Sequence, residues 1–106
     1  QEDVAGAERY FSRAVAMSPK SSRAHAGLGA AAYARGDRTA AYQAWARAIQ
    51  FDPNNFDALF SLGVNLARDG RTSDARPYLE RFMNSAPPAR YGDQLRSVAR
   101  LLQAGG

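Results

Sequence analysis

The sequence predicts an all-α protein built from stacked helical hairpins. The first observation is a period of 34 residues, on which Pro19, Pro53 and Pro87 fall. The second is that small and apolar residues recur on this period and, within each unit, at helical spacings. A self-similar interval of this length is typical of units that cannot bury their apolar faces alone and therefore stack. We expect a helix-turn-helix solenoid, which presents a surface for partners rather than a reaction centre.

Two stretches have the pattern of a first helix, residues 23–33 and residues 57–68. Serines at 21–22 and asparagines at 54–55 precede them, where a short polar side chain can accept hydrogen bonds from the free N–H groups of the first turn. The packing face of the two helices is marked by Leu28, Gly29, Ala32, Leu62, Gly63 and Leu66. The glycines expected to end these helices in a left-handed conformation are Gly36 and Gly70.

Second helices are expected at residues 38–51 and 73–84, each closing before a proline. Proline lacks the N–H group and moves the preceding residue away from helical angles, so Pro53 is a clear stop. Pro77 is harder to place, because a proline in a helix interior costs about 3 kcal/mol. We therefore expect its helix to start at Thr72 or later, which would leave its missing N–H in the unpaired first turn.

The two ends of the chain differ from the middle. Residues 1–18 match only the second half of a unit, because Ala7, Phe11 and Ala14 lie one period before Ala41, Trp45 and Ala48. After Pro87 a last helix has one apolar stripe and one polar face, as a terminal cap requires. Its apolar residues are Tyr91, Leu95, Val98 and Leu102.

These marks resemble the tetratricopeptide repeat family, whose unit is a helix-turn-helix of 34 residues. The matching residues are Leu28, Gly29, Gly36, Ala41, Trp45, Ala48 and Pro53 in one unit and Leu62, Gly63, Gly70, Ala75 and Pro87 in the next. Two residues depart from the pattern. Phe82 stands where Ala14 and Ala48 stand, and His25 stands where the family usually has a large aromatic residue. We expect both departures to change packing before they change function.

The resemblance implies a right-handed α-α superhelix forming a single domain over residues 1–106. The domain would begin with the second half of a truncated repeat at 1–20. Full repeats would follow at 21–54 and 55–88, with a capping helix at 89–103.

The resemblance also implies protein binding. In this family the face of the first helices opposite the packing residues lines a concave groove, which holds an extended peptide or a partner's helix. At 100° per residue, the residues on that face are Arg23, Ala26, Ala30 and Tyr33 in one unit and Asp57, Phe60, Val64 and Arg68 in the next. Because an exposed aromatic and aliphatic strip indicates a contact surface, we expect an apolar partner segment.

Of two alternatives to this groove, the first stays open and the second is rejected. Phe60 and Tyr33 could instead pack only against each other and the terminal helix. Some relatives clamp a C-terminal carboxylate with Lys, Asn and Arg residues on this face. Ala26, Ala30 and Ser61 stand near those places here, so we expect no such clamp.

A second class of function is a structural appendage of a larger, even enzymatic, protein. The chain starts at Gln1 without an initiator Met, so we expect an excised piece whose missing first helix leaves an apolar flank at the N-terminal end. That flank, formed by Tyr10, Phe11 and Val15, could drive self-association by exchange of helices between copies. Preceding repeats or another domain would cover it in the parent protein.

Nothing in the sequence points to an enzyme, a metal site or a cofactor. His25 is the single histidine and cysteine is absent, so neither a metal-ligand set nor a nucleophile with its base can be assembled. Acidic residues are scattered singly, and no phosphate-binding, esterase or zinc-protease motif occurs. We interpret His25 as a half-buried packing residue.

The net charge of +4 and the pI of about 10.0 keep an anionic partner in play. Charges alternate in sign at 35–38 and 68–71 without a basic run, so we expect no nucleic-acid binding. No apolar stretch approaches the roughly 18 residues needed to cross a bilayer, and we expect a soluble protein of the cytoplasm or periplasm. Lys20 is the only lysine beside many arginines, which suits a GC-rich bacterial genome.

Overall fold

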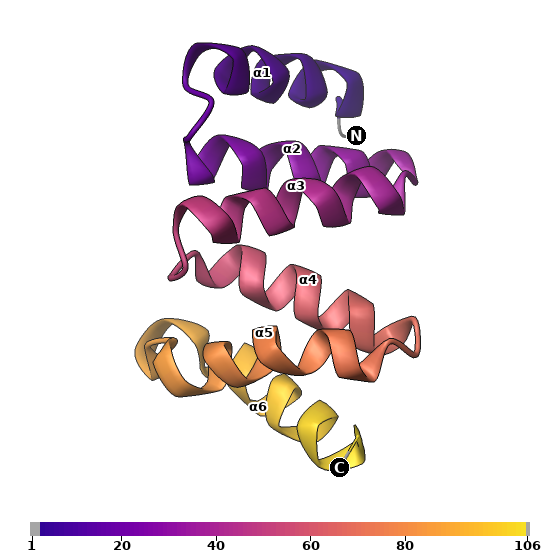
Figure 1. Ribbon diagram of the computed structural model, residues 1–106, viewed down its shortest axis with the longest axis vertical. Coiled ribbons are helices and arrows are strands. Elements are labelled where there is room, and N and C mark those ends of the chain that lie inside the picture. Colours follow the sequence, from indigo (N-terminus) through magenta and orange to yellow (C-terminus); the bar gives the residue numbers. More distant parts are fainter. Residues whose placement is uncertain (1–2, 106) are drawn as a thin grey trace. The chain divides into compact units, whose positions relative to one another are not determined.

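The computed structural model describes residues 3–105, and the described part is helical throughout, without a strand (Figure 1). This confirms the predicted all-α fold class. The expected domain limits at residues 1 and 106 lie outside the described residues. The helices are α1 (Val4–Met17), α2 (Ser22–Arg35), α3 (Arg38–Phe51), α4 (Phe56–Arg68), α5 (Thr72–Ser85) and α6 (Pro88–Gly105).

The chain forms two compact units, Gln1–Asn55 and Phe56–Gly106. The first contains α1, α2 and α3, and the second contains α4, α5 and α6. The division falls within one residue of the boundary expected between the two full repeats. That both units belong to one repeat domain stays a prediction.

In the first unit, side-chain caps start the helices where the sequence allows them. Ser21 Oγ accepts a hydrogen bond from the N–H of Ala24 at 3.1 Å, which confirms the expected cap of α2. Asp37 Oδ1 does the same for the N–H of Ala40 at the start of α3. Between these helices Gly36 has a φ of 92°, so α2 ends in the left-handed conformation expected of that glycine.

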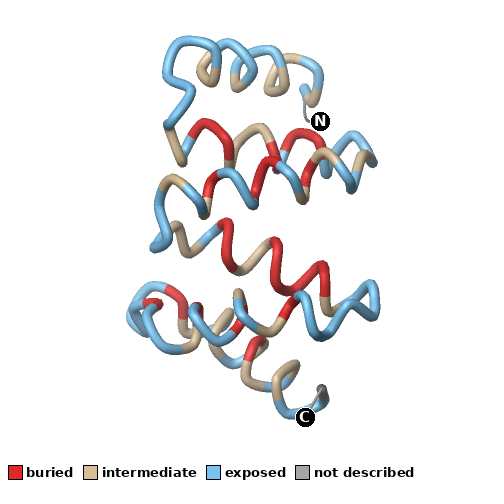
Figure 2. Tube along the Cα trace, viewed as in Figure 1, coloured by how far each residue is buried: buried red, intermediate tan, exposed pale blue. Residues whose placement is uncertain are grey.

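The α2–α3 pair is a tightly packed helical hairpin, with α1 against the other side of α2 (Figure 1). A Cβ atom on Gly29 would lie only 2.5 Å from Cδ1 and Nε1 of Trp45. Glycine at this position therefore lets the indole ring lie directly on the backbone of α2. Small buried residues make up the rest of this core (Figure 2), namely Ala24, Ala31, Ala32, Ala41, Ala44 and Ala48.

The second unit repeats the hairpin with α4 and α5 and adds α6, which lies against both helices. Gly63 takes the place of Gly29, since a Cβ there would lie 2.7 Å from Cδ2 of Leu79. The core is larger and more aromatic than in the first unit, because Phe82 is completely buried and its ring lies 5.5 Å from those of both Phe60 and Tyr91. Phe82 thus stands where Ala48 stands one period earlier, and α6 packs against its side chain through Tyr91.

Pro77 corrects one expectation. Its helix α5 does begin at Thr72 as required, but the N–H of Ala75 already donates to the carbonyl of Arg71 at 3.0 Å. Pro77 therefore lies beyond the unpaired first turn, and the carbonyl of Ser73 lacks the backbone donor that any other residue at position 77 would supply. Both residues are exposed, so water can reach that carbonyl.

The capping helix is also less regular than the sequence indicates. Tyr91 has non-helical angles of φ −116° and ψ 28°, which separates a short first turn after Pro87 from the rest of α6. The N–H of Tyr91 still donates to the carbonyl of Pro87 at 3.0 Å. The kink leaves the Tyr91 side chain buried beside Phe56 and Phe82.

Candidate functional site

The predicted binding residues of α2 lie on an accessible face of the first unit. Arg23, Ala30 and Tyr33 are exposed and Ala26 is half-buried. Tyr33 is 40% exposed, although its ring lies 5.8 Å from the ring of Trp45 at an angle of 37°. An aromatic side chain held by a buried neighbour while one side stays open to solvent is suited to contact a partner.

The predicted binding residues of α4 are less accessible. Asp57 and Arg68 are exposed, Phe60 is half-buried against Phe82, and Val64 is only 3% exposed. Val64 therefore offers almost no surface to a partner. That the α2 and α4 residues line one groove stays a prediction.

Asp57 has a partner that sequence reasoning missed. The Tyr91 hydroxyl donates a hydrogen bond to Asp57 Oδ1 at 3.1 Å. Burial raises the pKa of Tyr91, and the hydrogen bond to Asp57 adds to this rise because it favours the protonated hydroxyl. The two residues lie one period of 34 residues apart, but no sequence motif signals a hydrogen bond between them.

An apolar hollow of about 310 Å³ lies next to Ala30 in the first unit, between α1 and α2. Its walls include Phe11 from α1 and Ala34 from α2. Phe11 lies one period before Trp45, and this equivalence was the signal in the sequence that α1 contributes an aromatic side chain to the surface.

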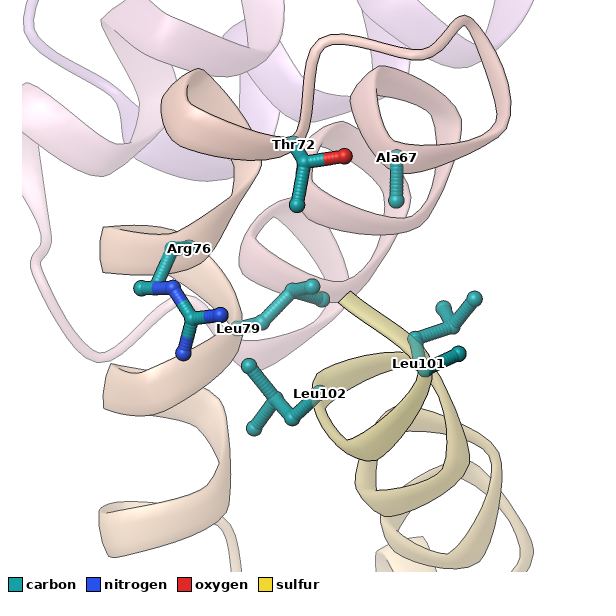
Figure 3. A pocket seen from close by; sticks show the side chains of 7 residues that line it. Ala67, Thr72, Arg76, Leu79, Leu101 and Leu102 are labelled. Atoms are coloured by element: carbon teal, nitrogen blue, oxygen red, sulfur yellow. The ribbon is translucent and has the colours of Figure 1, made fainter. Parts of the chain in front are cut away.

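A smaller pocket of about 190 Å³ lies in the second unit, where α6 covers α5 (Figure 3). Figure 3 shows Leu79 and Arg76 of α5 facing Leu102 of α6, with Ala67 of α4 at the far side. The Arg76 guanidinium is already 3.4 Å from Glu80 Oε2. This pocket is too small for a peptide segment and is best described as a gap in the packing of the capping helix.

Helix α1 exposes two large hydrophobic side chains, Tyr10 and Met17. Tyr10 is 69% and Met17 is 79% exposed, and α1 contains no buried residue. Of the flank expected from the sequence, Tyr10 is thus exposed, whereas Phe11 and Val15 are half-buried.

His25 is a packing residue, as expected, and is more deeply buried than expected. Its ring lies 5.4 Å from that of Phe51, and Nε2 lies 2.8 Å from the carbonyl oxygen of Pro19. Among residues 3–105, no three His, Asp or Glu side chains are grouped so that they could hold a metal ion. None of the helices in this part of the chain combines the length and apolarity needed to cross a bilayer.

Two family models match the chain. One described as TPR repeat matches residues 31–70, and one described as tetratricopeptide repeat matches residues 57–89, so that together they span more than half of the chain. A search of curated proteins gave no significant match. Repeats of this kind form a non-catalytic fold and are generally protein–protein interaction modules that bind proteins or peptides. With helical hairpins recurring at the predicted period, the protein is an all-α helical solenoid and belongs to the tetratricopeptide repeat family.

Proposed function

We propose that this protein is a scaffold or adaptor that binds an apolar segment of a partner protein along the first helices of its repeats. The observation that carries the proposal is Tyr33, which is 40% exposed while its ring is held against Trp45. An aromatic side chain fixed in this way loses little rotamer freedom on binding, which favours affinity. The proposed contact surface comprises Arg23, Ala26, Ala30, Tyr33, Asp57, Phe60 and Arg68, with the buried Val64 beneath it.

The residues of this surface have different roles. Tyr33 and the half-buried Phe60 are the apolar anchors, and the alanines of α2 allow a peptide backbone to approach closely. Arg23 and Arg68 are exposed and provide charge at the rim, which orients a partner more than it adds affinity. Val64, being buried, supports the helix surface from within.

The test uses peptides of about twelve residues selected from a random library on the full chain. We expect the selected peptides to be rich in apolar residues and to bind Tyr33→Ala or Phe60→Ala at least about ten-fold more weakly. Tyr10→Ala is the matched control, because it removes an equally large exposed aromatic side chain from α1. The proposal is wrong if both surface variants bind the selected peptides as well as the unaltered chain does.

A second candidate function is self-association or bracing of a larger protein through α1. The exposure of Tyr10 and Met17 favours it, since Ala44, one period after Tyr10, is buried in the α2–α3 hairpin. We expect light scattering to show dimers that Tyr10→Lys disperses. A monomer over the whole accessible concentration range would remove this candidate.

Catalysis has no place in either proposal. The fold is a non-catalytic one, and neither function requires a cofactor, a metal ion or nucleic acid.

A further inference from the structure

Helix α1 packs against α2 (Figure 1), and none of its residues is buried. The apolar hollow of about 310 Å³ between these two helices opens along α1. Of the residues that line it, only Ala31 is buried, whereas Phe11 is half-buried and Ala30 and Ala34 are exposed. The walls of the hollow are therefore accessible to another molecule.

The two hairpins show what covers a helix of this kind. In the α2–α3 hairpin, the first helix places Gly29 against Trp45 of the second. In the α4–α5 hairpin, Gly63 meets Leu79 in the same way. Phe11 lies one period before Trp45, and yet it is half-buried where Trp45 and Leu79 are buried. Helix α1 therefore has the face of a second helix, and no first helix lies on it within the described part of the chain.

One end of the hollow carries a negative charge. Asp3 lines this end, is exposed, and caps α1 by accepting a hydrogen bond from the N–H of Gly6 at 2.8 Å. Asp37 stands one period later and caps α3 in the same way. There the covering helix supplies the opposite charge, since Nη1 of Arg35, the last residue of α2, lies 3.4 Å from Asp37 Oδ2. A cation at the C-terminal end of a helix also interacts favourably with the helix dipole.

We infer that α1 is the docking site for an amphipathic α-helix of a partner protein, with a glycine where it crosses Phe11 and an arginine or lysine near its C-terminus. This helix lies on α1 as α2 lies on α3, and its apolar side chains enter the hollow. Its terminal cation pairs with Asp3, as Arg35 pairs with Asp37. An extended segment fits less well, because a helix covers the equivalent face in both hairpins.

A second copy of this chain is a poor donor of such a helix. Gly29 and Gly63 are buried inside their own hairpins, so a folded copy would have to open one hairpin to offer α2 or α4. We therefore assign the helix to a different protein. This assignment rests on the second candidate function, which makes α1 a binding face, and not on peptide binding at Tyr33, which does not line the hollow.

The first experiment titrates the full chain with blocked synthetic peptides and follows its backbone amides by NMR. The reference probe copies residues 21–36, because α2 is the helix with which the chain itself covers such a face. We expect it to shift the amides of Ala7 and Ala34. The Gly29→Leu copy should bind about ten-fold more weakly, because the added side chain keeps the helices apart. The Ala31→Pro copy cannot continue a helix and should bind at least about ten-fold more weakly too.

Three results would overturn the assignment. Equal binding of the Ala31→Pro copy would show that the occupant need not be a helix. Shifts confined to α3, or to Tyr33 and its neighbours, would place the probe elsewhere. Amide signals of Ala7 and Ala34 that move with chain concentration before peptide is added would make a second copy the occupant.

The second experiment changes the hollow and repeats the titration. Ala34→Phe fills the hollow from an exposed position and should weaken binding of the reference probe about ten-fold. Asp3→Asn keeps a residue suited to cap α1 but removes the charge. The Arg35→Glu copy of the probe should bind the original chain about two- to five-fold more weakly, and Asp3→Asn should abolish this difference. A difference that persists in Asp3→Asn would contradict the charge pairing.

Two controls make the result specific to the hollow. Ala16→Phe makes the same change as Ala34→Phe at an exposed α1 residue that lines no hollow described above, and binding should stay unchanged. Tyr33→Ala should also leave binding of the reference probe intact. Loss of the library-selected peptides in Tyr33→Ala with retention of this probe separates the two sites, whereas equal binding by Ala34→Phe and the original chain would contradict the docking site on α1. Circular dichroism verifies that each variant is folded.

Discussion

At the scale of single residues, the hairpins depend on positions where any side chain is too large. The Trp45 ring occupies the space beside Gly29 that a Cβ would need, and Trp45 itself is buried and cannot swing away. The same arrangement recurs at Gly63 and Leu79. Gly29 and Gly63 are therefore explained by helix packing.

We predict that Gly29→Ala destabilises the protein by about 1–3 kcal/mol, because the indole ring must shift in a packed core. This exceeds the gain in helix propensity of at most about 1 kcal/mol. Gly92→Ala is the matched control, since the nearest atom to its Cβ is the end of the Arg96 side chain at 3.9 Å. Urea unfolding should show the control to be neutral or more stable, and a Gly29→Ala protein as stable as the control would contradict the packing argument.

The Tyr91–Asp57 hydrogen bond should contribute about 1 kcal/mol, which Tyr91→Phe removes. Because the pKa of Tyr91 is raised in the folded state, its contribution is complete below the ordinary tyrosine value near 10. It is lost as the pH rises through the folded-state value. The stability difference between the original protein and Tyr91→Phe should therefore shrink from pH 9 to pH 11, measured by denaturant unfolding at each pH. A constant difference over this range would contradict the role given to the hydroxyl.

At the scale of helices, α5 keeps a proline beyond its first turn. Pro77→Ala restores an N–H that can donate to the carbonyl of Ser73, and we predict stabilisation by about 1–3 kcal/mol. Pro53→Ala is the control, because Pro53 follows α3 in a turn and its replacement restores no helical hydrogen bond. Thermal unfolding measures both variants. A Pro77→Ala protein less stable than the original would show that the proline serves the packing of α5.

Helix positions could largely be predicted from the sequence, because periodicity, caps and left-handed glycines act locally. The expected helix at 38–51 agrees with α3 at both ends, and those at 23–33 and 73–84 fall short of α2 and α5 by one or two residues at each end. The kink at Tyr91 could not be predicted, since it depends on how that side chain packs against Phe56 and Phe82.

The candidate site could be predicted only as a set of helix faces. Helical geometry places Arg23 and Tyr33 on one side of α2, but it does not tell which residues stay exposed. Val64 follows the same spacing as Phe60 and yet is buried. The contact between the Tyr33 and Trp45 rings could not be predicted either, because it depends on side-chain directions that come from the tertiary fold.

At the scale of the whole molecule, equivalent positions of successive repeats carry side chains of different size. Ala14 and Ala48 are small, whereas Phe82, at the same position of the repeat, is large and packs against α6 in the second unit. The pair Ala32 and Leu66 also changes from small to large, and both residues are buried. Because each repeat depends mainly on its neighbours, such exchanges alter local surfaces without altering the architecture.

The measurement that tests the central claim most directly is NMR of the full chain with a spin-labelled copy of a library-selected peptide. If the first helices bind the peptide, the label should broaden the amide signals of Ala26, Ala30 and Tyr33 in α2, and those of Asp57 and Phe60 in α4. Broadening confined to α1, α5 or α6, or uniform weak broadening over the whole chain, would contradict the account.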